Sequence, residues 1–260
     1  MQLQLEGKII AITGGAKGIG AAIARACVQE RAVPAIIDRD AEAGAKIEDE
    51  LVKAGSKAKW IKAELAESDQ CRKAVEEIVK AYGRIDGLVN NAGVNDRVGL
   101  ENGSPQEYVA SLQRNLLHYY NMAHFSLPHL KKSRGPIVNI ASKTAVTGQG
   151  GTSGYASAKG AILALTREWA VELLPYGIRV NAIVPAEVMT PLYRQWLSSF
   201  PNPEEKLMTI TSKIPLGQRM TQAEEIAAAA IFLLSEKAGH VTGQHWFIDG
   251  GYVHLDRALT

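Results

Sequence analysis

A short apolar segment that runs directly into a glycine-rich turn, near the start of the chain, constrains the fold most. Residues 8–13 (Lys-Ile-Ile-Ala-Ile-Thr) show no alternation of polar and apolar side chains, so we expect a strand buried on both faces. Gly14, Gly18 and Gly20 follow, and residues 21–28 have the pattern of a helix. Such a turn lets the backbone approach a pyrophosphate, which the helix N-terminus then holds. Alone, it is also compatible with an ordinary tight connection.

The next apolar run, residues 33–38 (Val-Pro-Ala-Ile-Ile-Asp), ends in an acidic residue and strengthens the nucleotide interpretation. Asp38 lies about twenty residues beyond the glycines, where a carboxylate is placed to accept hydrogen bonds from the ribose of an adenosine. The sequence therefore predicts a dinucleotide site at the start of the chain.

Strand and helix patterns alternate along the rest of the chain. This alternation predicts an α/β fold, a Rossmann-type doubly wound parallel sheet with helices on both faces. We find no linker, repeat or low-complexity tract, and expect one domain over residues 1–260. The seven predicted strands are residues 8–13, 33–38, 58–62, 87–90, 136–141, 179–184 and 245–248. The main predicted helices are residues 21–28, 41–54, 68–82, 105–131, the segment carrying Tyr155 up to about 174, and 223–234.

Tyr155 and Lys159 are spaced so that both side chains lie on one face of a helix, with Ser142 thirteen residues before the tyrosine. An ammonium beside a phenol favours the phenolate, so we expect Lys159 to lower a tyrosine pKa that is ordinarily about 10. The pair would then act as a general acid and base near neutral pH. A tyrosine and lysine at this spacing also occur by chance.

In combination, the motifs resemble those of the short-chain dehydrogenase/reductase family, over essentially all 260 residues. The resemblance implies that Tyr155 exchanges the proton, that Ser142 hydrogen-bonds the reacting oxygen and that Lys159 also holds the nicotinamide ribose. It further implies that Asn115 supports a water-linked proton relay. The motifs are Thr13-Gly14-x-x-x-Gly18-x-Gly20, Asn90-Asn91-Ala92-Gly93, Ser142, Tyr155-x-x-x-Lys159 and Ile248-Asp249-Gly250-Gly251.

The same resemblance implies a full set of residues that bind the cofactor. Glu64 stands where the family usually has an aspartate beside adenine, and Ala186 stands where it usually has a glycine after proline. The expected cofactor-binding residues are Gly14, Lys17, Gly18, Ile19, Gly20, Asp38, Arg39, Glu64, Leu65, Asn91, Ala92, Gly93, Tyr155, Lys159, Val188 and Thr190.

The choice between NAD and NADP depends on opposing charges. Asp38 favours a free 2′-hydroxyl and repels the extra phosphate of NADP. Lys17 and Arg39 are cations that could pair with that phosphate, but exposed ion pairs contribute only about 0–1 kcal/mol. We expect NAD to be preferred and NADP to be tolerated.

A segment at about residues 186–220 interrupts the alternation with several prolines and aromatic residues, and we expect a lid over the substrate. Polar side chains near the expected cleft, with Asp96 and Thr144 among them, favour a hydroxylated substrate, and the aromatic rings could stack on a sugar. The expected substrate-binding residues are Asn95, Ser142, Lys143, Gln149, Tyr155, Glu187, Tyr193 and Trp196.

Residues 185–193 (Pro-Ala-Glu-Val-Met-Thr-Pro-Leu-Tyr) are similar to the corresponding segment of L-fucose-type aldose dehydrogenases. We expect NAD(P)-dependent oxidation of an aldose at its anomeric carbon to a lactone. A 3-oxoacyl-acyl-carrier-protein reductase, or another hydroxy or keto short-chain dehydrogenase, is the alternative. A regulator that senses nucleotides without turnover is a further possibility, against which the complete catalytic set argues.

Composition excludes several other classes of function. The formal net charge of +2 does not favour nucleic acid, and 46% hydrophobic residues are ordinary for a globular protein. Three histidines on one predicted helix, His118, His124 and His129, lack the spacing of metal ligands, so we expect no metal and read them as surface or interface residues. Cys27 and Cys71 fit core positions without a disulfide.

Nothing in the sequence resembles a cleaved signal, and no apolar run approaches 18 residues. We therefore expect a cytoplasmic protein that binds a small-molecule substrate and no membrane. The family resemblance implies a homotetramer whose dimers pack the helices bearing Asn115 and Tyr155.

Overall fold

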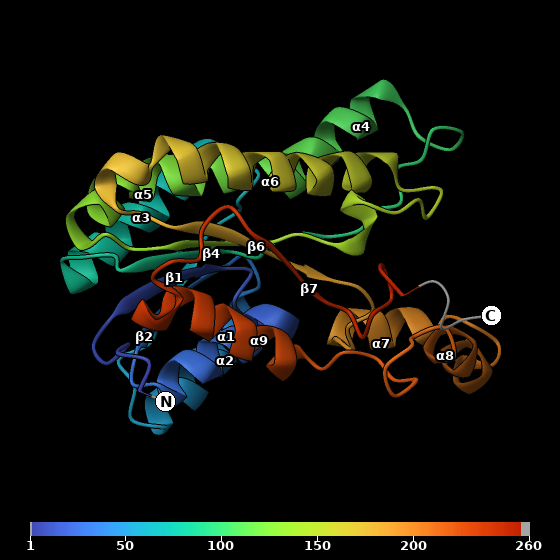
Figure 1. Cartoon of the computed structure of the whole chain (residues 1–260), viewed down its shortest axis with the longest axis horizontal. Coiled ribbons are helices and arrows are strands. Elements are labelled where there is room, and N and C mark those ends of the chain that lie inside the picture. The colour runs from blue at the N-terminus through green and yellow to red at the C-terminus, as the bar shows by residue number, and fades with distance from the viewer. Residues whose placement is uncertain (1, 256–260) are drawn as a thin grey trace.

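The computed structural model describes residues 2–255, so both ends of the predicted domain lie outside the described residues. Its sheet has seven strands, all parallel, in the order β3-β2-β1-β4-β5-β6-β7 (Figure 1). The predicted doubly wound sheet is thereby confirmed. The strands are β1 Ile9–Thr13, β2 Val33–Asp38, β3 Lys59–Lys62, β4 Gly87–Asn90, β5 Ile137–Ile140, β6 Val180–Pro185 and β7 His245–Ile248.

Helices cover both faces of the sheet, with α1, α2 and α9 on one face and α3, α5 and α6 on the other (Figure 1). The helices are α1 Gly18–Gln29, α2 Ala41–Lys53, α3 Ser68–Tyr82, α4 Pro105–Leu112, α5 His118–Ser133, α6 Ser153–Glu172, α7 Pro191–Leu197, α8 Pro203–Thr211 and α9 Ala223–Leu234. Within residues 2–255, no helix combines the length and apolar character needed to cross a bilayer.

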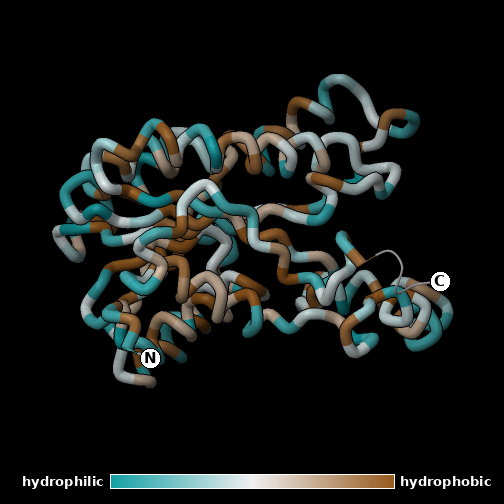
Figure 2. Tube along the Cα trace, viewed as in Figure 1, coloured by the Kyte–Doolittle hydropathy of each residue, from teal (hydrophilic) through white to brown (hydrophobic). Residues whose placement is uncertain are grey.

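Strand β1 explains why its sequence lacks alternation. Ile9 and Ala11 pack into the core beneath α3, α5 and α6, whereas Ile10 and Ile12 pack into the core beneath α1 and α9. All five residues of β1 are buried. Successive side chains point to opposite faces, so an apolar residue is needed at every position. Figure 2 shows the same concentration of hydrophobic residues along the central strands.

The single helix predicted for residues 105–131 is wrong in one respect that matters for the site. Helix α4 ends at Leu112, a π-helical turn (η1, Gln113–Leu117) follows, and α5 begins at His118. A π-turn inserts an extra residue and changes which side chains face inward, and such turns are frequent at functional sites. Here it contains Asn115.

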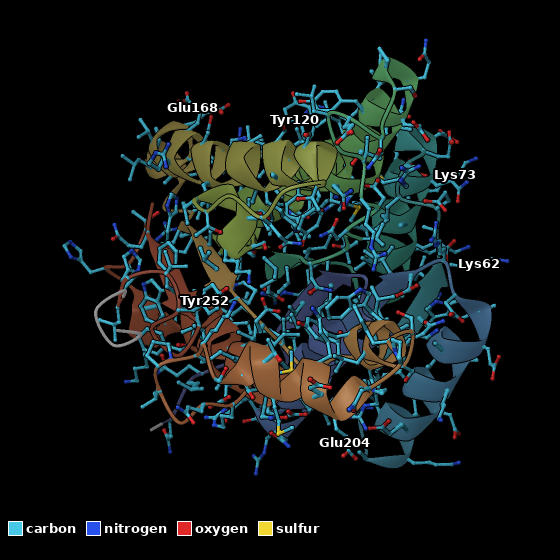
Figure 3. All side chains as sticks on the ribbon, turned by 90° about the vertical axis from the view of Figure 1, so that its right-hand side faces the viewer. Lys62, Lys73, Tyr120, Glu168, Glu204 and Tyr252 are labelled. Carbon is cyan, nitrogen blue, oxygen red and sulfur yellow. The ribbon has the colours of Figure 1, made fainter. Side chains whose placement is uncertain are left out.

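The segment predicted as an irregular lid contains two short helices, α7 and α8, which lie together at one end of the molecule (Figure 1). Thr190 caps α7 by accepting a hydrogen bond from the Tyr193 amide, and Asn202 caps α8 in the same way through the Glu205 amide. Figure 3 shows Glu204 of α8 on the opposite side of the molecule from Tyr120 of α5.

Candidate active site

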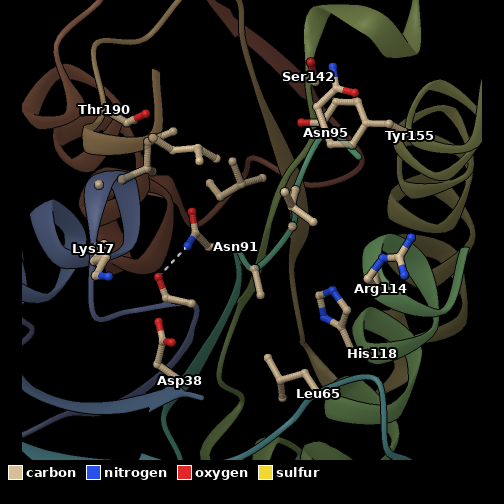
Figure 4. Close-up of a pocket in the computed structure, with 18 of the residues that line it drawn as sticks. Lys17, Asp38, Leu65, Asn91, Asn95, Arg114, His118, Ser142, Tyr155 and Thr190 are labelled. Carbon is tan, nitrogen blue, oxygen red and sulfur yellow. Dashed lines mark hydrogen bonds between the residues drawn. The ribbon is translucent and has the colours of Figure 1, made fainter. Parts of the chain in front are cut away.

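A cleft with a volume of about 530 Å³ lies at the carboxyl ends of β1, β2, β4, β5 and β6 (Figure 4). Ligands of parallel doubly wound sheets bind at this edge. The cleft brings together most of the residues predicted from sequence. Its walls include Gly14, Lys17, Gly18, Ile19, Asp38, Arg39, Glu64, Leu65, Asn91, Ala92, Gly93, Asn95, Ser142, Tyr155, Lys159, Val188, Thr190 and Tyr193.

The glycine-rich turn fits a pyrophosphate because its backbone is packed too closely for side chains. A Cβ atom on Gly20 would lie 2.2 Å from the carbonyl oxygen of Gly14, although Gly20 itself does not line the cleft. The Asn91 side-chain amide donates to the carbonyls of Thr13 and Gly14, at 3.0 Å each (Figure 4). The turn is therefore tied to the end of β4, and the N-terminus of α1 follows it at the cleft.

The Asp38 carboxylate is fixed at the end of β2 by two backbone amides. Its Oδ2 accepts a hydrogen bond from Ala16 at 3.1 Å, and its Oδ1 accepts one from Asp40 at 3.0 Å. Lys17 pairs with Asp40, and Arg39 pairs with Glu64. Both cations that could attract a 2′-phosphate are thus engaged with carboxylates.

Ser142 and Tyr155 lie at the other end of the cleft, beside Asn95 (Figure 4). Burial raises the pKa of Tyr155 to about 12, although a hydrogen bond with Ser142 acts in the opposite direction. The expectation that the pKa of Tyr155 is lowered is therefore wrong, because desolvation of the buried phenol raises it. Tyr155 is therefore a phenol at neutral pH.

Lys159 is buried, and its ammonium is hydrogen-bonded to groups other than Tyr155. Its Nζ donates to the Tyr119 hydroxyl at 3.0 Å and to the carbonyl oxygen of Ile140 at 2.8 Å. The same atom lies 5.6 Å from the centroid of the Tyr155 ring. Desolvation lowers the pKa of Lys159 to about 7. The group consequently changes charge near neutral pH.

Asn115 is fully buried in the π-turn, unlike most asparagines within helices. Its Oδ1 accepts a hydrogen bond from the Val94 amide at 2.7 Å, and its Nδ2 donates to the Ser111 carbonyl at 3.1 Å. A Cβ atom on Gly93 would lie 3.2 Å from this Oδ1 and 3.4 Å from Lys159 Nζ. A side chain at position 93 would therefore crowd both groups.

Two predicted substrate residues form a buried ion pair beside Ser142. The Lys143 ammonium pairs with the Glu187 carboxylate, and their side chains are only 10% and 14% exposed. The Tyr193 hydroxyl donates to Glu187 Oε2 at 2.7 Å, and Lys143 Nζ lies 4.1 Å from the centroid of the Tyr252 ring. Three separate segments of the chain thus meet at these four residues, which we call the Glu187 cluster.

Four of the predicted substrate residues, Lys143, Gln149, Glu187 and Trp196, do not line the cleft. Gln149 is exposed on the loop before α6, and Trp196 packs edge-on against Tyr193 with ring centroids 5.1 Å apart. Trp196 therefore supports Tyr193 rather than facing the cleft. Among the described residues, no group of three or more histidine, cysteine or acidic side chains is arranged to hold a metal ion.

Sequence reasoning missed several residues of the site. His118, expected at the surface or at an interface, is 1% exposed and lines the cleft, and Arg114 lines it as well. Arg114 pairs with Asp96, which also accepts a hydrogen bond from the Ser111 hydroxyl. His118 follows Asn115 by three residues, a helical spacing that indicates a shared face.

Residues 14–253 match the family model described as Enoyl-(Acyl carrier protein) reductase. The chain is 38% identical to L-fucose dehydrogenase of Bos taurus over 252 residues, which are 96% of this chain and 91% of that protein. It is 36% identical to 3-oxoacyl-acyl-carrier-protein reductase FabG of Thermotoga maritima over 252 residues, 96% of this chain and all of that protein.

Two solved structures resemble the whole chain. The Cj0485 dehydrogenase superposes with a TM-score of 0.96 at 49% identity, covering 100% of this chain and 99% of that one. The aldohexose dehydrogenase of Thermoplasma acidophilum, in ligand-free form, superposes with a TM-score of 0.86 at 31% identity, covering 97% and 96%.

Proposed function

Because this chain belongs to the short-chain dehydrogenase/reductase family of NAD(P)-dependent oxidoreductases, we propose that it oxidises the anomeric hydroxyl of an aldose similar to L-fucose, giving a lactone. The observation that carries the choice of substrate is the Glu187 cluster next to Ser142. Two relatives support it by their names, an L-fucose dehydrogenase and an aldohexose dehydrogenase.

The residues of the cleft fit a nicotinamide dinucleotide. The glycine turn would receive the pyrophosphate, Asp38 the adenosine ribose, and Val188 and Thr190 the carboxamide. The bound nicotinamide supplies an acceptor for hydride. A side chain at Gly20 would clash with the backbone of the glycine turn, and a side chain at Gly93 would crowd the Lys159 ammonium.

Proton transfer is assigned to Tyr155, whose hydroxyl lies with Ser142 at the substrate end of the cleft. Oxidation requires that Tyr155 first lose its own proton and then accept the proton of the sugar hydroxyl. Ser142 donates a hydrogen bond to the reacting oxygen as its carbonyl forms. Lys159, when protonated, favours the phenolate electrostatically and holds the nicotinamide ribose, and Asn115 supports a relay to solvent through water.

The Glu187 cluster suits a neutral, polyhydroxylated substrate. Tyr193 is the member of the cluster that lines the cleft, and its hydroxyl, which donates to Glu187 Oε2, can still accept a hydrogen bond from a substrate hydroxyl. The ion pair carries no net charge, which removes the attraction that an anionic substrate would need. Asn95 adds an amide at the same end of the cleft.

We propose NAD as the preferred cofactor, with NADP tolerated. The Asp38 carboxylate is held rigidly where it would repel a 2′-phosphate, and Lys17 and Arg39 would have to leave their carboxylate partners to bind one. Exposed ion pairs of this kind are individually weak, so the fixed carboxylate dominates.

A 3-oxoacyl-acyl-carrier-protein reductase is the alternative, supported by 36% identity to FabG. That activity would favour an unpaired basic surface at the mouth of the cleft, for an acidic carrier protein. Lys143, the cation nearest Ser142 in sequence, is instead neutralised by Glu187.

We further propose one catalytic domain whose residues 186–220 form a lid over the substrate, in a cytoplasmic homotetramer. Tyr120, labelled in Figure 3, is 54% exposed and stacks with His124 on the outer face of α5. Leu117 and Val109 are exposed nearby in sequence, and apolar side chains of this kind favour packing against a second copy.

A panel of substrates tests the proposal. The purified protein would be assayed at 340 nm with NAD and with NADP on L-fucose, other aldoses, and simple secondary alcohols. Its reverse activity would be measured on a 3-oxoacyl thioester. We expect kcat/KM to be highest for an aldose with NAD. Faster reduction of the 3-oxoacyl thioester than oxidation of any aldose would overturn the proposal.

A further inference from the structure

His118 is a buried polar side chain on the wall of the cleft, and both of its ring nitrogens lack hydrogen-bond partners. Within residues 2–255, the other buried side chains with an unpartnered polar atom do not line the cleft. They are Ser56, Asn90, Ser126 and Thr144. Buried polar groups are nearly always hydrogen-bonded, so an unpartnered imidazole at a ligand cleft indicates a partner that arrives with the ligand.

The position of His118 is fixed by its neighbours. It is the first residue of α5, immediately after the π-turn, and its ring packs against Tyr119 with centroids 4.8 Å apart. Only 1% of the surface of His118 is exposed, so its ring can contact only a ligand that lies directly against this wall of the cleft.

The half of the cleft that His118 faces is the one expected to hold adenosine. Figure 4 shows the ring between Leu65 and Arg114, across the cleft from Asp38 and away from Ser142 and Tyr155. Leu65 and Asp38 are the residues assigned to adenine and to its ribose. A flat base lying against Leu65 would therefore meet the imidazole.

The imidazole is neutral in this setting. Burial, together with repulsion by the nearby charge of Lys159, lowers the pKa of His118 to about 3, although the Arg114 carbonyl, which lies near the ring but outside hydrogen-bond geometry, acts in the opposite direction. A neutral imidazole has one donor and one acceptor nitrogen. Both the ring nitrogens of adenine and the ribose hydroxyls offer the complementary atoms.

We infer that His118 binds the adenosine half of the dinucleotide, through a hydrogen bond from or to one ring nitrogen, directly or through a single water. The inference rests on the dinucleotide occupying this cleft and is independent of which sugar is oxidised. It adds a contact from α5 to an adenosine site otherwise built from the glycine turn and the strand ends.

The test compares fragments of the cofactor. AMP carries the adenosine half and nicotinamide mononucleotide carries the other half, so affinities for the two separate the ends of the cleft. His118→Phe keeps an aromatic ring against Tyr119 and removes both nitrogens, and His240→Phe, at an exposed position outside the cleft, is the matched control. We expect His118→Phe to weaken AMP and NAD binding about tenfold, the loss of one hydrogen bond, with nicotinamide mononucleotide and the control unchanged.

Equal affinity of wild type and His118→Phe for AMP would overturn the inference, as would an equal loss for both fragments. The wild-type protein supplies a second measurement that needs no substitution. The imidazole ¹⁵N shifts of His118 should move on addition of AMP and not of nicotinamide mononucleotide. Unmoved shifts at saturating AMP would also overturn it.

Discussion

The Lys159 ammonium donates its hydrogen bonds to Tyr119 and Ile140, and lies 5.6 Å from the centroid of the Tyr155 ring. Although Lys159 and Tyr155 share a helical face, the hydrogen bonds of the Lys159 ammonium go to other groups. Burial favours the neutral form of both groups: it raises the pKa of Tyr155 to about 12 and lowers the pKa of Lys159 to about 7. At neutral pH, Tyr155 is therefore a protonated phenol, and Lys159 titrates.

Replacing Tyr155 by Phe should remove the proton acceptor and leave the cleft otherwise intact. General acid and base catalysis contributes roughly 10²–10⁴ in rate, so kcat should fall by about that factor. NADH binding, followed by fluorescence, should change little. A Tyr155→Phe enzyme that keeps more than a tenth of the wild-type kcat contradicts the assignment.

The direction of the reaction should set its pH dependence. Because the pKa of Tyr155 lies near 12, the phenolate needed for oxidation becomes more abundant as pH rises, while the phenol needed for reduction is present throughout the neutral range. Oxidation should therefore accelerate from pH 7 to pH 10, and reduction should not. Steady-state kcat in both directions checks this, and an oxidation rate that falls over the same range argues against Tyr155 as the base.

Lys159→Met should abolish activity and change how stability depends on pH. The unfolded lysine has a pKa of 10.5 and the folded one about 7, so between these values the unfolded chain binds one more proton. Wild-type stability should rise with pH through that window, and the variant should lack this contribution. The free energy of unfolding of the variant relative to wild type should thus be most favourable near pH 7.

Urea unfolding at pH 7 and pH 10 measures this difference. Each pKa unit between the folded and unfolded values of Lys159 corresponds to about 1.4 kcal/mol of stability. The gain in the variant is partly offset, because Tyr119 and Ile140 lose the hydrogen-bond donor that Lys159 supplies. The comparison between the two pH values removes that constant offset. A relative stability that is identical at both pH values would show that Lys159 is charged in the folded protein.

Asp38→Ala should narrow or invert the preference for NAD, because it removes the carboxylate that repels a 2′-phosphate. Arg39→Ala should weaken NADP more than NAD. The ratio of kcat/KM for the two cofactors is the measurement. Wild-type enzyme that uses NADP tenfold better than NAD would show that Asp38 does not act on the ribose.

Replacing one member of the Lys143–Glu187 pair should lower the stability of the protein more than expected from the effect of replacing both members together. Lys143→Met or Glu187→Gln leaves the other member buried without its partner, whereas the double variant leaves no unpaired charge. We expect each single variant to raise KM for the aldose at least tenfold, and the double variant to be less destabilised than the sum of the two. Lys213→Met, at an exposed position, is the control. Strictly additive losses in stability would show that the pair is not coupled.

The sequence predicted those parts of the fold that depend on local pattern. Strand β1 and the glycine turn are contiguous, and burial on both faces of a parallel sheet leaves a continuous apolar run that is easily read. Asp38, Asn91 and Ser142 lie at or just after the carboxyl ends of their strands, so a parallel sheet places them at one edge, and the strand pattern alone predicts this.

What the sequence could not predict depends on packing between distant segments. The π-turn at Asn115 is an interruption that the helical pattern does not reveal, and it decides the placement of His118. Lys143 and Glu187 are 44 residues apart and meet because β5 and β6 are neighbours. The pKa of Tyr155 was expected to fall, but its direction is set by desolvation, which spacing along a helix does not measure.

The most direct test of the proposed reaction follows the hydrogen on the anomeric carbon. L-Fucose deuterated at C1 would be incubated with the enzyme and NAD, and the reduced cofactor and the sugar product would be analysed by mass spectrometry. We predict that the deuterium appears in the NADH and that the product is the lactone. NADH formed without deuterium, from this sugar or from any other aldose labelled at C1, would contradict oxidation at the anomeric carbon.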